Sequence, residues 1–207
     1  MNSVKQVKPS SLFLDILKDY NIILCSNSLR RHELLKALDI TFTISANYKY
    51  DETYPESMRL LDVPAYLAEH KSDKYPELLG EKDILITADT LVVCNNELWG
   101  KPKDRDDAIR MLTKMSDNKH EVLTGVCLRS LDKRRTFAVS TYVYFHRLEK
   151  SEIEYYVDKY QPYDKAGAYG VQEWIGDIGI ERIEGSYYNV MGLPVQRLYA
   201  ELMEFVG

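Results

Sequence analysis

Apolar residues along this chain follow strand-like and helix-like patterns that alternate early and give way to paired strands in the middle. A buried strand appears as a short apolar run or a strict alternation, whereas a helix repeats its apolar residues every three or four positions. The segments predicted as strands are 22–25, 41–45, the two arms of 83–102 on either side of Asn95-Asn96, 122–130 and 136–148. The segments predicted as helices are 11–18, 28–38, 63–75, 104–115, 151–160 and 194–206.

Residues that favour turns and helix ends support these boundaries. Asn95 and Asn96 suit a tight turn because asparagine tolerates positive φ better than most residues. Asp104 is placed to cap the helix after it, and Ser151 with Glu154 has the Ser-x-x-Glu spacing of a capping box. Helices alternate with strands early, hairpins dominate the middle, and no period repeats, so the pattern predicts an α/β fold with a mixed sheet.

Composition narrows the possible functions. At 207 residues and 45% hydrophobic, the chain can bury a substantial core. A formal net charge of −5 argues against a general nucleic-acid binder, although a local basic pocket for one polyphosphate remains compatible with it. The short apolar patch near the N-terminus is interrupted by Asp15, which makes a poor signal peptide and no membrane span. The three cysteines lack Cys-x-x-Cys spacing, so we expect a reducing, cytoplasmic location and no membrane partner.

The segment Ser26-Asn27-Ser28-Leu29-Arg30-Arg31 joins the first predicted strand to the helix after it. Backbone N–H groups, two hydroxyls and two guanidiniums can converge there, where the helix dipole favours an anion, so this turn is a candidate phosphate cradle. The alternative is that Ser28 only caps the helix while the arginines are solvated, and spacing alone leaves both interpretations open. The segment has no glycine-rich Walker pattern, which excludes a P-loop.

Charged residues outside this turn are candidates for chemistry on a phosphate substrate. Asp89 interrupts an apolar run, and a carboxylate at such a strand end can coordinate a metal or activate water. Each candidate also has a structural interpretation: Asp89 as the cap of a turn, Lys101 as a loop lysine, Glu52 as a solvated carboxylate, and Lys71 as a surface ion pair with Glu69. Taken one at a time, none of these residues shows whether its role is chemical or structural.

Other residue types exclude some chemistries. The four histidines are scattered without a zinc-ligand set, and no Gly-x-Ser-x-Gly elbow supports Ser-His-Asp catalysis. Carboxylates with lysines suit Mg²⁺ or Mn²⁺ and a phosphate substrate better. Gly125 and the pair Tyr187-Tyr188 are expected to serve close packing.

Several stretches taken together resemble the Maf family of nucleoside triphosphate pyrophosphatases. They are SNSLRRHELL from Ser26, DE at Asp51-Glu52, LAEHK from Leu67, ADTLVV from Ala88, GKP from Gly100, HEVLTGV from His120, DKAGAYGVQ from Asp164 and IEGSYYNVMGLP from Ile183. They occur in order from about residue 22 to the C-terminus. The resemblance implies a strongly twisted mixed sheet with flanking helices and two lobes around a central cleft, as in inosine triphosphatases.

The resemblance also implies an activity: hydrolysis of a nucleoside triphosphate to the monophosphate and pyrophosphate, with Mg²⁺ or Mn²⁺ as cofactor. It makes Asp89 the proton acceptor, and we assign Glu52 and Asp89 as metal ligands. The substrate-contacting residues it implies are Ser26, Arg30, Arg31, Lys71, Lys101, Asp164 and Lys165, to which the candidate cradle adds Ser28.

Three positions mark the subgroup of this family that acts on dTTP and UTP, and here they are Arg30, Thr90 and Gln172. The Gln172 amide offers a donor and an acceptor, which match the edge that thymine and uracil share. We expect Gly167 and Gly170 to let the backbone approach the ligand closely. Two alternatives stay open: a housecleaning pyrophosphatase for modified nucleotides, and a non-catalytic nucleotide-sensing module linked to cell division.

Three features depart from the family pattern, and one of them is Ser116-Asp117 in place of the usual Ser-Gly before the histidine. The usual Ser-Pro-Arg-Arg is Ser28-Leu29-Arg30-Arg31, which loses the proline at the helix start. Residues 1–20 form an N-terminal extension without a family counterpart, and we assign it no role; residues 21–207 are interpreted as a single domain. The resemblance suggests a homodimer, to which Tyr155, Tyr156 and Trp174 would contribute as exposed aromatic residues.

Overall fold

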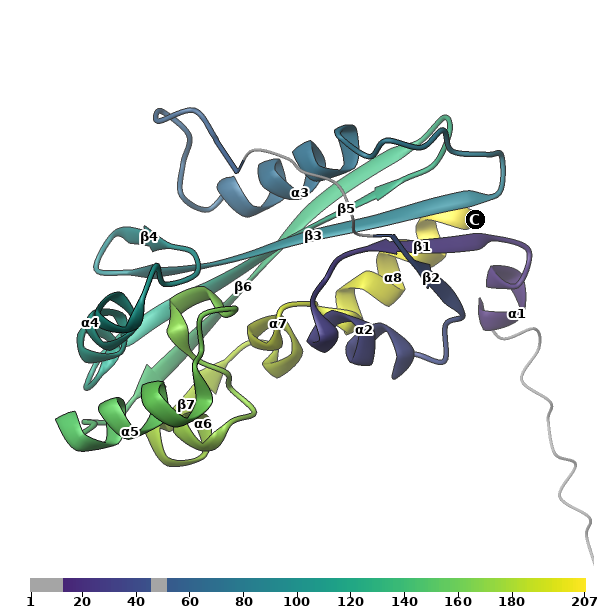
Figure 1. Cartoon of the computed structure of the whole chain (residues 1–207). Helices are drawn as coiled ribbons and strands as arrows, with labels where there is room; N and C mark the ends of the chain where they lie inside the picture. Colours follow the sequence, from purple (N-terminus) through teal and green to yellow (C-terminus); the bar gives the residue numbers. More distant parts are fainter. Residues whose placement is uncertain (1–12, 46–51) are drawn as a thin grey trace, which may run out of the picture.

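The computed structural model describes residues 13–45 and 52–207. Within them, a seven-stranded mixed sheet carries helices on both faces, in the strand order β2-β1-β3-β5-β6-β7 with β4 beside β3 (Figure 1). The strands are β1 (Asn21–Cys25), β2 (Phe42–Ile44), β3 (Asp83–Cys94), β4 (Glu97–Trp99), β5 (Lys119–Arg129), β6 (Arg134–Phe145) and β7 (Ile180–Glu184). The helices are α1 (Phe13–Leu17), α2 (Leu29–Lys36), α3 (Val63–Asp73), α4 (Arg105–Met115), α5 (Lys150–Tyr160), the 3-10 turn η1 (Ala166–Ala168), α6 (Trp174–Gly179), α7 (Tyr187–Met191) and α8 (Val195–Val206).

Both strand orientations occur in the sheet, which confirms the predicted mixed α/β fold. β1 pairs in parallel with β2 and β3, because the chain crosses over through α2 and α3 between them. β3, β5, β6 and β7 pair in antiparallel fashion, and β4 returns beside β3 after the turn at Asn95 and Asn96. Both asparagines have positive φ, 50° and 62°, as the predicted tight turn requires.

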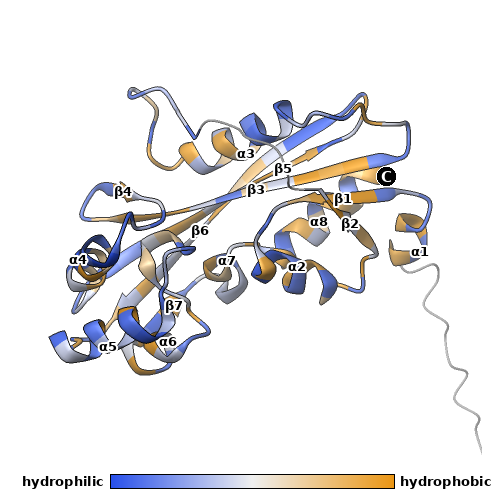
Figure 2. Cartoon of the chain, viewed as in Figure 1, coloured by the Kyte–Doolittle hydropathy of each residue, from blue (hydrophilic) through white to orange (hydrophobic). Residues whose placement is uncertain are grey.

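Two hydrophobic clusters form two lobes, and β3 runs from one to the other. Ile84 and Ile86 belong to the first cluster, with residues of β1, α2 and α8, whereas Val92 and Cys94 belong to the second, with residues of α4, α5 and α6. Figure 2 shows the hydrophobic colour along β1 and β3 and polar colour on the outer turns of α4 and α5. The segment of β3 between the clusters therefore lies at the cleft that was expected between two lobes.

Close packing at Gly125 seats α3 on the sheet. A Cβ atom at Gly125 would lie 2.1 Å from the backbone oxygen of Pro64 in the first turn of α3. Any side chain would push the helix away, so the prediction that this glycine serves close packing is confirmed. The similar expectation for Tyr187 and Tyr188 is wrong, because these residues of the short helix α7 are 40% and 49% exposed.

The residue that caps α4 is the one predicted from the sequence, but the residues that cap α5 are not. The side chain of Asp104 accepts a hydrogen bond from the Asp107 backbone and caps α4 as predicted. The capping box of α5 is formed by Glu149 and Glu152, so the predicted pair of Ser151 and Glu154 is wrong. A carboxylate can accept a hydrogen bond from a backbone N–H of the first turn, as a hydroxyl does. The helix therefore begins before Ser151.

The N-terminal extension contributes to the first lobe, although no role was assigned to it. Phe13 and Leu17 of α1 are buried in the first cluster, and the Phe13 ring meets the edge of Tyr199 on α8 at 5.0 Å between centroids. The predicted helix 11–18 is thus present from Phe13 to Leu17, while its first two residues lie outside the described part of the chain.

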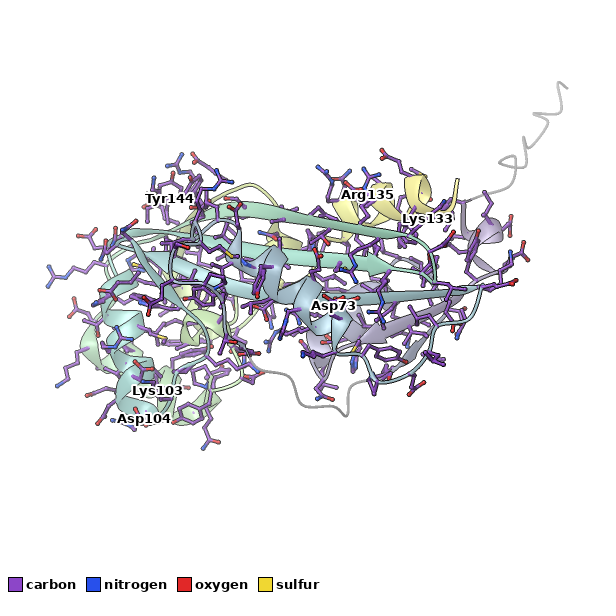
Figure 3. All side chains as sticks on the ribbon, turned by 90° about the horizontal axis from the view of Figure 1, so that it is seen from above. Asp73, Lys103, Asp104, Lys133, Arg135 and Tyr144 are labelled. Carbon is purple, nitrogen blue, oxygen red and sulfur yellow. The ribbon has the colours of Figure 1, made fainter. Side chains whose placement is uncertain are left out.

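Ion pairs join α8 to strand β6 of the sheet. Arg135 on β6 pairs with the buried carboxylate of Glu201 and lies 2.7 Å from Glu204, both on α8. In the view from above, Lys133 and Arg135 lie beside α8 in one lobe and Lys103 and Asp104 lie in the other (Figure 3). Across residues 13–45 and 52–207, every helix is too short or too polar to cross a bilayer.

Candidate functional site

A cavity of about 950 Å³ opens between the two lobes, within the size range of small-molecule sites. Its walls come from the β1 to α2 turn, α3, the middle of β3, the loop after β4, segment 164–173 and the end of α7. Every site residue predicted from the sequence lines it: Ser26, Ser28, Arg30, Arg31, Glu52, Lys71, Asp89, Thr90, Lys101, Asp164, Lys165 and Gln172. Residues distant in sequence are thereby brought to one place.

The β1 to α2 turn is ordered by its two serines. The Ser28 hydroxyl accepts a hydrogen bond from the Arg31 backbone N–H at 3.5 Å and caps α2, and the Ser26 hydroxyl accepts from the Ser28 N–H at 3.2 Å. The capping interpretation of Ser28 is therefore confirmed. Because the same turn also lines the cavity, the two interpretations do not compete, and phosphate binding stays a prediction.

Arg31 uses its guanidinium to join three parts of the protein. Its Nε donates to the Gly192 carbonyl at 2.8 Å, one Nη to the Ala88 carbonyl at 2.9 Å, and the other Nη to the Thr90 hydroxyl at 2.9 Å. The Thr90 hydroxyl also lies 3.1 Å from the Thr124 hydroxyl. Arg31 thus holds the end of α7 and the Thr90 side chain in register at the cavity wall.

Lys71 and Asp89 form a buried pair at the centre of the cavity wall. Lys71 is 6% exposed and Asp89 is 7% exposed, and the ammonium donates a short hydrogen bond to an Asp89 carboxylate oxygen. The Glu52 carboxylate lies 3.7 Å from the same ammonium. A surface pair of Lys71 with Glu69 is excluded, because Glu69 lies on another side of α3 and bonds Arg134 instead.

Segment 164–173 supplies a second charged cluster. Asp164 lies 2.8 Å from Arg30 of α2 and 2.8 Å from its neighbour Lys165. Burial alone would raise the pKa of the Asp164 carboxyl, but the hydrogen bonds from Lys165 and Arg30 outweigh it and lower that pKa to about 2. Gln172 and Lys101 are exposed side chains on the cavity wall.

Packing within the protein also requires the two glycines of this segment, and the expectation that they let the backbone approach a ligand stays a prediction. Gly167 has a φ of +69°, and a Cβ atom there would lie 2.8 Å from Val92. At Gly170, a Cβ atom would lie 2.7 Å from the Glu173 side chain. A side chain at either position would therefore collide with protein atoms before any ligand enters.

The sequence did not reveal the buried pair of His120 and Tyr169. Their polar atoms, Nε2 and the hydroxyl oxygen, are 2.7 Å apart, and Tyr169 lines the cavity. Burial lowers the pKa of His120 to about 3, so the ring is neutral. Both residues stand in motifs that were singled out, but no local signal indicates that positions 49 apart share a contact.

Glu33 and Glu173 were also missed, and with them the described lining carries equal numbers of cationic and carboxylate side chains. The cations are Arg30, Arg31, Lys71, Lys101 and Lys165, and the carboxylates are Glu33, Glu52, Asp89, Asp164 and Glu173. Across the described part of the chain, no group of three or more His, Cys, Asp and Glu side chains is positioned to hold a metal ion. Glu52 and Asp89 instead meet at the Lys71 ammonium.

The fold and the cleft define a class: an α/β protein whose interlobe cavity, lined by paired charges, can bind a small charged ligand. The chain belongs to the Maf-like protein family, whose model matches residues 21–205. A dTTP/UTP pyrophosphatase of Parabacteroides distasonis is 50% identical over 93% of this chain and 100% of its own length. Proteins of the same name are 49% identical in Porphyromonas gingivalis, over 93% of this chain and 98% of theirs, and 47% identical in Bacteroides fragilis, over 91% and 97%.

A solved structure of a HAM1 protein from Coxiella burnetii matches 89% of this chain and 99% of its own, with a TM-score of 0.45 and 13% identity. At that level of likeness nothing follows for the fold or the activity.

Proposed function

We propose that this chain hydrolyses nucleoside triphosphates to the monophosphate and pyrophosphate, with dTTP and UTP as its preferred substrates. The observation that carries the proposal is the meeting of two charged clusters in one cavity: Lys71 with Asp89, and Arg30 with Asp164 and Lys165. Relatives that match the chain over nearly their whole length are named for this activity.

Asp89 is the proposed base. A water molecule oriented by its carboxylate attacks a phosphorus atom beside the α–β bridging oxygen, the bond from that phosphorus to the bridging oxygen breaks, and the water proton passes to Asp89. Lys71 holds the carboxylate in place through its short hydrogen bond. Lys101, Lys165 and Arg30 supply positive charge for the pyrophosphate that is formed, since all three line the same cavity.

The carboxylates beside Lys71 can supply oxygen ligands to Mg²⁺ or Mn²⁺. Both ions prefer oxygen ligands and are commonly held by one or two carboxylates together with substrate phosphates, and Glu52 and Asp89, which both contact the Lys71 ammonium, would supply such carboxylates. Because cations and carboxylates balance in the described lining, a triphosphate adds negative charge that the protein alone does not neutralise. A divalent cation held by Glu52 and Asp89 would neutralise that charge and polarise a phosphoryl oxygen.

Gln172 is the proposed reader of the base. Its side chain is exposed on the cavity wall, and its amide offers a donor and an acceptor to the pyrimidine edge. Thr90 and Arg30, the other positions of the dTTP/UTP subgroup, line the same cavity. Uracil and thymine share this edge, whereas cytosine presents the reverse pattern, so dTTP and UTP are preferred over CTP.

Pyrophosphate release measured across dTTP, UTP, CTP, GTP and a set of base-modified triphosphates, with Mg²⁺, Mn²⁺ or a chelator, tests the proposal. We expect dTTP and UTP to be fastest and the chelator to stop the reaction. Faster turnover of a modified nucleotide would favour the housecleaning alternative. Tight binding without pyrophosphate release would favour the nucleotide-sensing alternative and overturn the proposal.

We also propose that the chain works in the cytoplasm as a homodimer. Of the aromatic residues suggested for the interface, Tyr155 is 45% exposed and lies 5.0 Å from the half-buried Trp174, so these two remain candidates. Tyr156 is 0% exposed, which makes its suggested contribution wrong. Light scattering of the purified protein, with Tyr155→Ser as a comparison, tests the dimer; a monomer at all concentrations would refute it.

A further inference from the structure

Glu173 directly follows the proposed base reader, Gln172, and reaches back into its own segment. One carboxylate oxygen lies 3.1 Å from the Lys165 ammonium, and the other accepts a hydrogen bond from the Tyr156 hydroxyl. The same Tyr156 hydroxyl accepts from the Gly170 backbone N–H at 3.0 Å. Glu173 therefore ties together the start of the segment, its middle, and helix α5 beneath it.

The position of Glu173 in the chain offers its side chain another partner. It is the N-cap residue of α6, where a side-chain oxygen can accept a hydrogen bond from the first turn of the helix. Here the side chain makes no such bond. Both oxygens are directed to Lys165 and Tyr156 instead.

Two further features show that the segment is built around this carboxylate. Gly170 has no side chain where a Cβ atom would lie 2.7 Å from the carboxyl carbon of Glu173. Burial and the hydrogen bond to Glu173 raise the pKa of the Tyr156 hydroxyl far above its ordinary value, so the hydroxyl stays protonated and donates a hydrogen bond to the carboxylate.

The flanking residues explain why this matters for Gln172. Val171 is 5% exposed on one side of it, and Glu173 is held on the other, so the exposed Gln172 side chain projects from a backbone that is fixed at both neighbours. Lys165 is 8% exposed and lies between the carboxylates of Asp164 and Glu173. The Glu173 side chain thus fixes the position of both the Lys165 ammonium and Gln172.

We propose that Glu173 is a positioning residue that sets both the Lys165 ammonium and the Gln172 amide for the substrate, with Tyr156 as its anchor on α5. The inference rests on the proposed hydrolysis of dTTP and UTP. It adds a residue outside the subgroup positions, and it predicts that phosphate binding and base selection weaken together when Glu173 is changed.

Glu173→Gln separates the two contacts. The amide oxygen still accepts from Tyr156, while the amide N–H₂ group faces the Lys165 ammonium and cannot hold it. We expect kcat/KM for dTTP to fall about 10-fold to 100-fold, and the preference for dTTP over CTP to narrow. Tyr156→Phe removes the anchor but leaves the contact with Lys165, so we expect it to narrow the preference with a smaller loss of kcat/KM.

Asp177→Asn is the matched control. Asp177 is an exposed carboxylate on the same helix, α6, and does not line the cavity, so this variant should keep wild-type kinetics. Amide hydrogen exchange of residues 164–173 gives a readout that does not depend on turnover. Both site variants should speed exchange at Gly170 or its neighbours, while the control leaves it unchanged.

The outcomes separate the inference from the proposed function. If wild type hydrolyses dTTP but Glu173→Gln and Tyr156→Phe keep its rate, its dTTP over CTP preference and its exchange, the positioning role is overturned. If no triphosphate is turned over by wild type while exchange in the segment still responds, the proposed hydrolysis fails and the positioning of the segment stands. Should Glu173→Gln not fold, Tyr156→Phe decides through the same two readouts.

Discussion

Replacing Gly125 by alanine should damage stability and activity together. Gly125 on β5 pairs directly with Asp89 on β3, and α3, which carries Lys71, rests on it. An added Cβ atom would lie 2.1 Å from the Pro64 oxygen and 2.3 Å from the Ala65 nitrogen, whereas ordinary contacts begin at 3.4 Å. Because these are backbone atoms, α3 itself has to move, by roughly 1 Å.

The magnitudes follow from that displacement. Overpacking of this kind costs about 1–3 kcal/mol, and we expect the upper end because no flexible side chain can yield. For a protein of this size, about 3 kcal/mol lowers Tm by roughly 6–12 °C. A shift of roughly 1 Å between catalytic groups typically costs about 10²-fold in rate, here by separating Lys71 from Asp89.

Thermal unfolding and pyrophosphate release from dTTP, the latter below both melting temperatures, measure the two effects. Gly80→Ala is the control: a Cβ atom there meets only the Asp83 side chain, at 3.5 Å, so Tm and rate should stay near wild type. A Gly125→Ala protein with wild-type Tm would refute the backbone contact. A lowered Tm with an unchanged rate would refute the link between α3 and the pairing of Lys71 with Asp89.

Three further predictions concern single side chains. Asp89→Asn should lower kcat by about 10²-fold to 10³-fold while the protein still folds, and wild-type turnover of dTTP would disprove its role as base. Gln172→Ala should change the ratio of kcat/KM for dTTP to that for CTP more than kcat itself; an unaltered ratio counts against base reading. Burial lowers the pKa of His120 from 6.5 to about 3, so on acidification the unfolded chain binds this proton first and stability falls between those pH values. By pH 5 the loss is about 2 kcal/mol, and the slope of Tm against pH should be shallower in His120→Phe.

Local patterns in the sequence predicted most of the fold. The apolar run at 22–25, the cap at Asp104 and the turn at Asn95-Asn96 each depend on neighbours in sequence, and each is found in the structure. α6, β7 and α7 were not predicted, because they are short elements whose form depends on packing. Gly176 illustrates this: a Cβ atom there would lie 2.1 Å from the Val171 oxygen, a contact that no periodicity reveals.

The candidate site was predictable as a set of residues but not as a set of contacts. Motifs gathered the charged residues, and one cavity brings them together. They did not indicate that Arg31 bonds Thr90 and two carbonyls, or that Tyr156 is a buried anchor rather than an exposed aromatic. Such assignments depend on which partners tertiary packing places opposite each side chain, and a list of residue types does not contain that information.

The packing of α1 on α8 has a practical consequence for handling the protein. A shortened version beginning at Asn21, where the family match starts, would remove Phe13 and Leu17 from the first cluster. Each buried side chain of this kind contributes about 1.5–3 kcal/mol, and Tyr199 on α8 would lose the ring it packs against. We expect such a version to precipitate more readily and to melt earlier than the full chain, even though every motif of the cavity would still be present.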